Sequence, residues 1–372
     1  TPTYTPTPTA VIPIPVGLEP KGVAVDPGTG YLYVPNRDSN TVSVINSGHY
    51  VVGTIPVGTR PFGSALNPNT HKLYVANYDS NSVSVIDTNS NTLFRTISLS
   101  PYGGPSHVAI NVNTNRIYVT LHADGRLAII RGDNDTVLTT VETGAGAFGV
   151  AVYPAANKIY VSNRDTKEIS VIDGATNSKL WGETIYLSNP DNTPYGSPYA
   201  LAINGVLGRL YVTLASDAPN FADPNRLVVY DISHSHNWLA TLNVGSLSEG
   251  LGVNEAAGRF YVSSGGDDTL TMVDAYSNLP GLTLFTGRRP LGIGANAATG
   301  RVYVANRGDG TVSVFTDGGA VPVTTATPTA TPTPLVQQVS ITDAGFTPPL
   351  ITVAPGTTVQ WINNGSLTHS VT

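Results

Sequence analysis

Two histidines come closest to a metal-binding pattern in this sequence. His234 and His236 are separated by one residue, so both imidazoles would lie on one side of an extended segment. Zinc sites use three or four protein ligands, and no third ligand accompanies this pair in the sequence. The seven histidines of the chain form no zinc or haem pattern. We therefore interpret His234 and His236 as residues of a surface loop.

Three short polar segments could supply oxygen ligands to a cation. Two of them read Asp-Ser-Asn, at residues 38–40 and 79–81, and the third is Gly-Asp-Asn-Asp at 132–135. Side chains of this kind satisfy the backbone in hairpin turns, and segment 132–135 lacks the ligand series and final Glu of a calcium loop. We predict turns at all three. The sequence shows no Ser-His-Asp order or diagnostic carboxylate pair, so it gives no positive indication of an enzyme.

The composition excludes several classes of partner. The net charge is −6 and no run of Lys or Arg is present, so binding to nucleic acid or an anionic membrane has no electrostatic basis. No apolar run reaches the roughly 18 residues that span a bilayer. The absence of cysteine excludes disulfides and thiol chemistry. Charged residues make up 12% of the chain, against about 25% in typical domains, which suits short strands and many turns.

A repeated motif organises most of the chain. Tyr-Val-x-Asn, followed after a turn by Val-Ser-Val, recurs about every 40 to 50 residues. The strict copies begin at Tyr33, Tyr74, Tyr160 and Tyr303, and looser copies that lack the Asn begin at Tyr118, Tyr211 and Tyr261. A repeat of this length is typical of propellers and solenoids.

Each repeat has the pattern of four antiparallel strands separated by turn residues. Four strands in about 40 residues form one blade of a β-propeller, so we predict an all-β, seven-bladed β-propeller over residues 10–320. The last unit is one strand short, and residues 11–17 match the fourth-strand segment 52–58. We expect the N-terminal strand to complete the last blade and to remove a free sheet edge. Insertions at 188–198 and 215–226 would lie on one face of blade five.

The residues just before the seven inner strands would surround the channel mouth of the propeller. They are Lys21, Phe62, Ser106, Phe148, Tyr199, Glu249 and Leu291, and His107 follows Ser106. A mainly apolar cup with a few polar groups is the usual form of a ligand pocket. The alternative interpretation is packing between blades.

Thr-Pro tracts flank the propeller. Residues 1–9 and a linker at 321–335 are rich in Thr and Pro, which favours extended, semi-rigid spacers. Such tracts also carry O-linked glycans in secreted proteins. Together with the low charge, they indicate an extracellular or cell-surface location.

The Tyr-Val-x-Asn copies, with their Asp-Ser-Asn turns, resemble the YVTN-type β-propeller family over about residues 10–320. This resemblance implies seven blades and a secreted or cell-surface protein of archaea or bacteria. Members of the family mostly have no assigned reaction. The motif is specific for the fold and carries little information on function.

Residues 336–372 resemble the first part of a cupredoxin domain, a β-sandwich. The similar elements are Gly356-Thr357-Thr358-Val359-x-Trp361, the pair Asn363-Asn364, and His369. The resemblance implies that His369 is a copper ligand, with a Cys, a second His and usually a Met supplied later in the chain. A copper cofactor would therefore need completion of this domain elsewhere, because the sequence has no Cys. An incomplete β-unit would also pair its edges with other protein chains, including copies of itself.

Three functional hypotheses follow. The first is a non-enzymatic surface protein that binds or assembles, associating with itself as an oligomer or filament. The second is an electron-transfer protein with a completed copper domain. The third is a sugar-binding, ligand-binding or enzymatic propeller that uses the face near Tyr195, Phe221, Phe62 and Phe148.

Overall fold

A computed structural model describes residues 13–187, 196–215 and 226–316, together with the backbone of four strands between residues 319 and 363. The chain divides into two compact units, Thr1–Val321 and Pro322–Thr372. Among the described residues, no helix is both long enough and apolar enough to span a membrane. Of the predicted insertions of blade five, residues 188–195 with Tyr195 and residues 216–225 with Phe221 lie outside the described residues, as does His369, whereas residues 197–198, 215 and 226 belong to strands.

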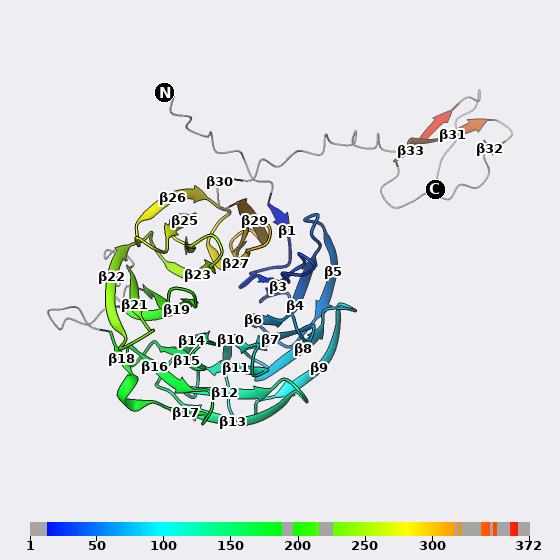
Figure 1. Cartoon of the computed structure of the whole chain (residues 1–372). Coiled ribbons are helices and arrows are strands. Elements are labelled where there is room, and N and C mark those ends of the chain that lie inside the picture. The colour runs from blue at the N-terminus through cyan, green and yellow to red at the C-terminus, as the bar shows by residue number, and fades with distance from the viewer. Residues whose placement is uncertain are drawn as a thin grey trace, which may run out of the picture. The chain divides into compact units, whose positions relative to one another are not determined.

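The first unit is a ring of seven β-sheets, each running from an inner to an outer strand (Figure 1). Blade one contains β2 (Ala24–Val25), β3 (Leu32–Asn36), β4 (Thr41–Ile45) and β5 (Val51–Pro56). Blade two contains β6 (Pro61–Asn67), β7 (Lys72–Asn77), β8 (Ser82–Asp87) and β9 (Thr92–Ser98), and blade three β10 (Pro105–Asn111), β11 (Arg116–Leu121), β12 (Arg126–Arg131) and β13 (Thr136–Glu142). The prediction of a seven-bladed propeller is confirmed.

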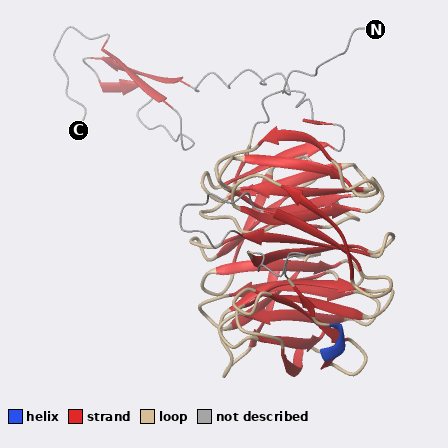
Figure 2. Ribbon diagram, turned by 90° about the vertical axis from the view of Figure 1, so that its left-hand side faces the viewer, coloured by secondary structure: helices blue, strands red, loops and turns tan. Residues whose placement is uncertain are grey.

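Blade four has a divided outer strand. It contains β14 (Ala147–Tyr153), β15 (Lys158–Asn163) and β16 (Glu168–Asp173), and two short strands, β17 (Ser178–Lys179) and β18 (Ile185–Tyr186), both pair with β16. A single 3₁₀ turn, η1 (Trp181–Glu183), interrupts them and lies at the rim of the ring (Figure 2). The outer edge is therefore irregular here, and it carries an exposed Trp181.

Blades five and six return to the regular pattern. Blade five contains β19 (Ser197–Asn204), β20 (Arg209–Ala215), β21 (Arg226–Asp231) and β22 (Asn237–Asn243). Blade six contains β23 (Ser248–Asn254), β24 (Arg259–Ser264), β25 (Thr269–Asp274) and β26 (Pro280–Phe285).

The outer strand of blade seven is built from two pieces of chain. The blade contains β27 (Pro290–Asn296), β28 (Arg301–Asn306) and β29 (Thr311–Thr316). β1 (Ile14–Pro15) pairs with the first part of β29, and β30 (Gly319–Ala320) pairs with its last part. The pairing predicted for the N-terminal strand is thus present, but this strand shares the outer position with β30.

The hydrophobic cores lie between blades rather than within them. Seven clusters of buried side chains each join two neighbouring blades, and the cluster around Ile14, Leu32 and Val312 joins the last blade to the first. Inner strands approach so closely that a Cβ on Gly250 would lie 1.7 Å from the Leu291 carbonyl oxygen. This contact explains the recurrent Gly at the start of the inner strand, because only Gly lacks a Cβ.

The motif residues hold the blades together by hydrogen bonds. In the strict repeats the Asn side chain donates to the middle Ser of Val-Ser-Val on the next strand: Asn36 to Ser43, Asn77 to Ser84, Asn163 to Ser170 and Asn306 to Ser313, over 2.8–3.0 Å. The key Tyr hydroxyl reaches a left-handed turn residue of the following blade: Tyr33 meets Asn91, Tyr74 meets Asp135, Tyr160 meets His236 and Tyr303 meets His49. The repeat is therefore a set of contacts within and between blades.

The second unit contains a sheet of three described strands. β31 (Val336–Thr342) lies in the centre, antiparallel to β32 (Gly345–Thr347) and parallel to β33 (Thr358–Asn363). Ser340 is paired with Thr347 on one side and with Ile362 on the other.

Candidate ligand-binding site at the channel mouth

Two sets of loops meet on one face of the propeller, which we call the mouth face. One set joins each blade to the next inner strand, and the other joins the second and third strands of a blade. Backbone bonds tie the sets together, as from Arg37 N to Glu19 O, Tyr78 N to Arg60 O and Arg307 N to Arg289 O. Side chains at the ends of these loops therefore converge near the channel axis.

The predicted mouth residues of blades two to five form one aromatic cluster. The Phe148 ring lies 4.6 Å from the His107 imidazole and 4.4 Å from the Tyr199 ring, and Phe62 lies 5.2 Å from His107, measured between centroids. Such edge and offset contacts add stability beyond apolar burial. Four of the predicted site residues are thus brought together.

His107 is held neutral by this environment. Burial lowers the pKa of its imidazole to about 4, with His122 and Arg164 nearby adding to the effect. Its Nδ1 is buried and has no hydrogen-bonding partner among the described residues, and the same is true of His122 Nδ1. The neutral imidazole of His107 has one ring nitrogen that donates a hydrogen bond and one that accepts.

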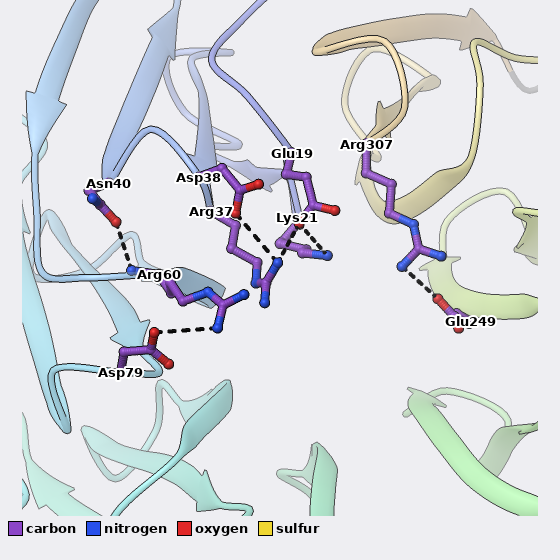
Figure 3. A network of polar contacts seen from close by, with 9 residues as sticks. All are labelled: Glu19, Lys21, Arg37, Asp38, Asn40, Arg60, Asp79, Glu249 and Arg307. Atoms are coloured by element: carbon purple, nitrogen blue, oxygen red, sulfur yellow. Dashed lines mark hydrogen bonds and ion pairs between the residues drawn. The ribbon is translucent and has the colours of Figure 1, made fainter.

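The opposite side of the mouth is charged. Lys21 pairs with Glu19 at 3.2 Å, Arg37 pairs with the same carboxylate at 2.8 Å, and Arg307 pairs with Glu249 at 3.2 Å (Figure 3). Burial lowers the pKa of the Lys21 ammonium, although Glu19 opposes the effect. The charges of these cationic side chains are therefore largely balanced by the carboxylates with which they pair.

Arg164 differs from the other cations of the mouth. Its guanidinium carbon lies 5.1 Å from the centroid of the Phe148 ring and 4.8 Å from that of Tyr199. Its Nε is buried without a hydrogen-bonding partner among the described residues, as is the Nε of Arg307. Unlike Lys21, Arg37 and Arg307, however, Arg164 has no carboxylate of the described residues within ion-pair distance. Burial and the nearby Glu249 raise the pKa of the Tyr199 hydroxyl to about 12, so this neighbour stays neutral.

The sequence interpretation missed a second set of side chains at the mouth. Each of them directly follows Tyr-Val-x-Asn or its looser form, and they are Arg37, Tyr78, His122, Arg164 and Arg307. Counting one residue beyond the motif would have found them. Three of the five are arginines, in a chain with only 19 Lys and Arg, which is the signal that was available.

Two predicted mouth residues have no role at the surface of the site. Ser106 is fully buried, its hydroxyl lies 2.8 Å from that of Thr120, and it also contacts the Phe148 carbonyl. Leu291 is buried as well, and its carbonyl accepts a hydrogen bond from Ser263. For these two positions the structure agrees with packing between blades.

The histidine pair does not form a joint site. His236 occupies the left-handed position of a turn and contacts the Tyr160 hydroxyl at 3.0 Å, with 10% of its side chain exposed. The His234 side chain is 80% exposed and bonds to Ser233. The two rings do not lie side by side, because the segment is a turn rather than an extended strand.

The described residues contain no group of three or more His, Cys, Asp or Glu side chains that could hold a metal ion. The segments at 38–40, 79–81 and 132–135 are turns, as predicted. A mononuclear copper centre of the cupredoxin type needs a thiolate. The residues of this chain do not fit such a centre, because the sequence has no cysteine.

Comparison with known proteins supports the fold. No protein-family model matches the chain. The structure is similar to a chain of Kuenenia stuttgartiensis hydrazine synthase, with a TM-score of 0.70 and 18% identity, over 85% of this chain and 99% of that one. At this identity the similarity concerns the fold alone. A stretch of 33 residues, 9% of the chain, is 67% identical to the PE-PGRS family protein PE_PGRS18 of Mycobacterium tuberculosis, and it spans 7% of that protein.

Proposed function

We propose that the protein is a non-enzymatic binding module, located outside the cell or on its surface, that takes a carboxylate-bearing ligand at the channel mouth. The observation that carries this proposal is the Arg164 guanidinium, stacked on Phe148 and Tyr199. Guanidinium groups bind carboxylates through two parallel hydrogen bonds.

The surroundings of Arg164 favour such a ligand. The two rings fix the side chain before binding, so little rotamer entropy would be lost on contact with a ligand. Removal of the mouth from bulk water strengthens a charge-assisted hydrogen bond. Phe62 and Phe148 supply the apolar wall that the body of the ligand would contact. The ion pairs of Lys21, Arg37 and Arg307 leave Arg164 as the anchoring charge.

Location and mode of action are supported by separate features. The Thr-Pro tracts and the YVTN-type motif favour an extracellular protein. The Ser106 hydroxyl, which a nucleophilic mechanism could use, is committed to Thr120 and to a backbone carbonyl. The mouth therefore offers charge and apolar surface to a ligand.

Benzoate and its neutral isostere benzamide are suitable probes, measured by calorimetric titration of the full chain. We expect benzoate to bind, benzamide to bind at least tenfold more weakly, and Arg164→Gln to abolish the difference. Arg95→Gln is the matched control, because Arg95 is exposed on an outer strand and bonds to the carbonyl of Asn134. Equal binding of both probes, or unchanged benzoate binding by Arg164→Gln, would refute the proposal.

Self-association is a second candidate, favoured by the sheet of the second unit. Among its described strands, β32 and β33 each pair with β31 alone, so each has a side to which a further strand could add. Light scattering on the full chain at increasing concentration tests this role. A mass that rises above 38.8 kDa supports strand addition between chains, and a constant monomer mass contradicts it.

A further inference from the structure

We infer that a groove between blades three and four binds the rings of a neutral oligosaccharide. This groove of about 490 Å³ lies on the mouth face, and its lining includes Asp165, the neighbour of Arg164 in the chain, but not Arg164 itself. Its volume falls in the range of about 300–1,000 Å³ that is usual for ligand sites. Its lining consists of residues 122–126, residues 142–146, Asp165, Glu168, Lys179 and Trp181. We call it the inter-blade groove.

Trp181 provides an aromatic platform at the outer end of the groove. It belongs to the 3₁₀ turn that interrupts the outer strand of blade four, and 72% of its surface is exposed. An indole left in water forgoes the apolar burial that stabilises most tryptophans. The C–H face of a pyranose ring covers such a surface while its hydroxyl groups stay free for polar contacts.

The position of the platform is fixed by a bond across the blades. The Lys179 ammonium lies 4.3 Å from the centroid of the Trp181 ring, donates to the Thr143 carbonyl oxygen over 2.6 Å, and pairs with Glu168 at 3.1 Å. Only 5% of the Lys179 side chain and 13% of that of Glu168 are exposed. The indole is therefore attached to a buried ion pair rather than to a loose loop.

The polar lining selects hydroxyl groups over charged groups. The groove carries both donors and acceptors: Arg126 pairs with Glu142 at 2.8 Å, and Asp124 accepts a bond from Gly103 N. Hydroxyl groups can both donate and accept, so a sugar matches such a mixed lining. Four carboxylates (Asp124, Glu142, Asp165 and Glu168) outnumber two cationic side chains (Arg126 and Lys179), which disfavours an anion. The ligand class thus differs from that proposed for the mouth.

The test uses the fluorescence of Trp181 in the full chain. Trp238→Phe with Trp361→Phe leaves Trp181 as the sole tryptophan, because the chain has three. Maltotetraose, cellotetraose, chitotetraose and mannotetraose are titrated separately, up to about 10 mM. We expect at least one of them to shift or quench the emission with a saturable curve.

Variants connect this signal to the groove. In the chain that keeps all other tryptophans, Trp181→Ala should weaken calorimetric binding of the active sugar at least tenfold, and Asp165→Asn should weaken it about three- to tenfold. Trp238→Ala is the matched control, since Trp238 is 51% exposed on the outer strand of another blade. The inference fails if none of the four sugars binds, or if Trp181→Ala binds as well as the control. Benzoate binding at the mouth should be unchanged by Trp181→Ala, so the two proposals succeed or fail separately.

Discussion

The hydroxyl group of Tyr74 donates a 2.8 Å hydrogen bond to the carboxylate of Asp135, which belongs to the next blade. Tyr74 is fully buried and Asp135 is 4% exposed, so the bond connects two blades in the absence of water. Burial and the Asp135 charge raise the pKa of Tyr74, and the hydroxyl keeps its proton. The Tyr of the repeat therefore acts as a polar link between adjacent hydrophobic cores.

Loss of this link should destabilise the ring. Tyr74→Phe removes one hydroxyl group and leaves the Asp135 carboxylate with Lys72 as its remaining side-chain partner. We expect a loss of about 1.5–3 kcal/mol in the free energy of unfolding, the range for a hydrogen bond to a charged group. Urea unfolding measures it, with Tyr186→Phe, which is 71% exposed, as control. Equal stability of the two variants would show that the bond contributes nothing.

Acid should weaken the fold through His107. Its pKa lies at about 4 in the folded chain and near 6.5 ordinarily, so the unfolded chain binds the proton more readily. Above about pH 6.5 His107 is neutral in both the folded and the unfolded chain and costs no stability. As the pH falls towards 4, its protonation in the unfolded chain lowers the free energy of unfolding by about 3 kcal/mol. Burial lowers the pKa of His49 and His236 too, so they act in the same direction.

The part of the acid-induced loss of stability that is due to His107 can be measured by comparing the parent chain with a variant that lacks this imidazole. His107→Gln removes its titration, so the loss of stability between pH 7 and pH 4.5 should be smaller in this variant than in the parent chain. His234→Gln, at an exposed position, serves as control. If the parent and His107→Gln lose the same free energy over this interval, the imidazole is not responsible.

The Asn and Ser of the repeat should be coupled. Blade three has Leu121 and Ala128 at the positions of Asn77 and Ser84, so both polar partners are replaced together. We expect Asn77→Leu alone to cost about 1–3 kcal/mol, because it leaves a buried hydroxyl without its partner. Adding Ser84→Ala should recover about 1 kcal/mol. Thermal unfolding of the two single variants and the double variant gives the coupling energy between Asn77 and Ser84. If the effects of the two substitutions on the free energy of unfolding simply add, the side chains are not coupled.

A glycine before the inner strand should resist substitution. A Cβ at Gly58 would lie 2.7 Å from Asn77 Cγ, whereas one at Gly53 would have no neighbour within 4 Å. We predict that Gly58→Ala costs about 1–3 kcal/mol through overpacking. Gly53→Ala should be neutral or should stabilise by about 0.4–1 kcal/mol. The denaturant midpoints of both variants measure these changes in stability. An unchanged midpoint for Gly58→Ala would contradict the predicted crowding.

The repeat determined how much of the fold could be predicted. Strand alternation and turn residues recur seven times, so local patterning and global architecture agree. The partners of the Tyr hydroxyls were not predictable, because they lie 58 to 76 residues away in chain order for Tyr33, Tyr74 and Tyr160 and differ in type. Two of these turn residues are His49 and His236, and nothing in the sequence indicated that either contacts a Tyr of the repeat.

The candidate sites were predicted less completely. The residues before the inner strands indicated the aromatic side of the mouth, since Phe62, Phe148 and Tyr199 share one repeat position. Arg164 was missed because its role depends on two rings supplied by other segments. The inter-blade groove could not be inferred, because it combines loops of two blades with a 3₁₀ turn that the repeat pattern does not contain.

The divided outer strand of blade seven determines how the ring would respond to mechanical tension. β1 and β30 lie one after the other along β29, with Ile14 opposite Val312 and Ala320 opposite Phe315. A pull on the chain before Ile14 and after Ala320 acts directly on the pairing of these two short strands with β29. Each short strand would then peel away one hydrogen bond at a time, instead of shearing along its length. We therefore expect the blade that closes the propeller to open first under load, whatever its resistance to heat, because forced opening depends on a local unfolding rate.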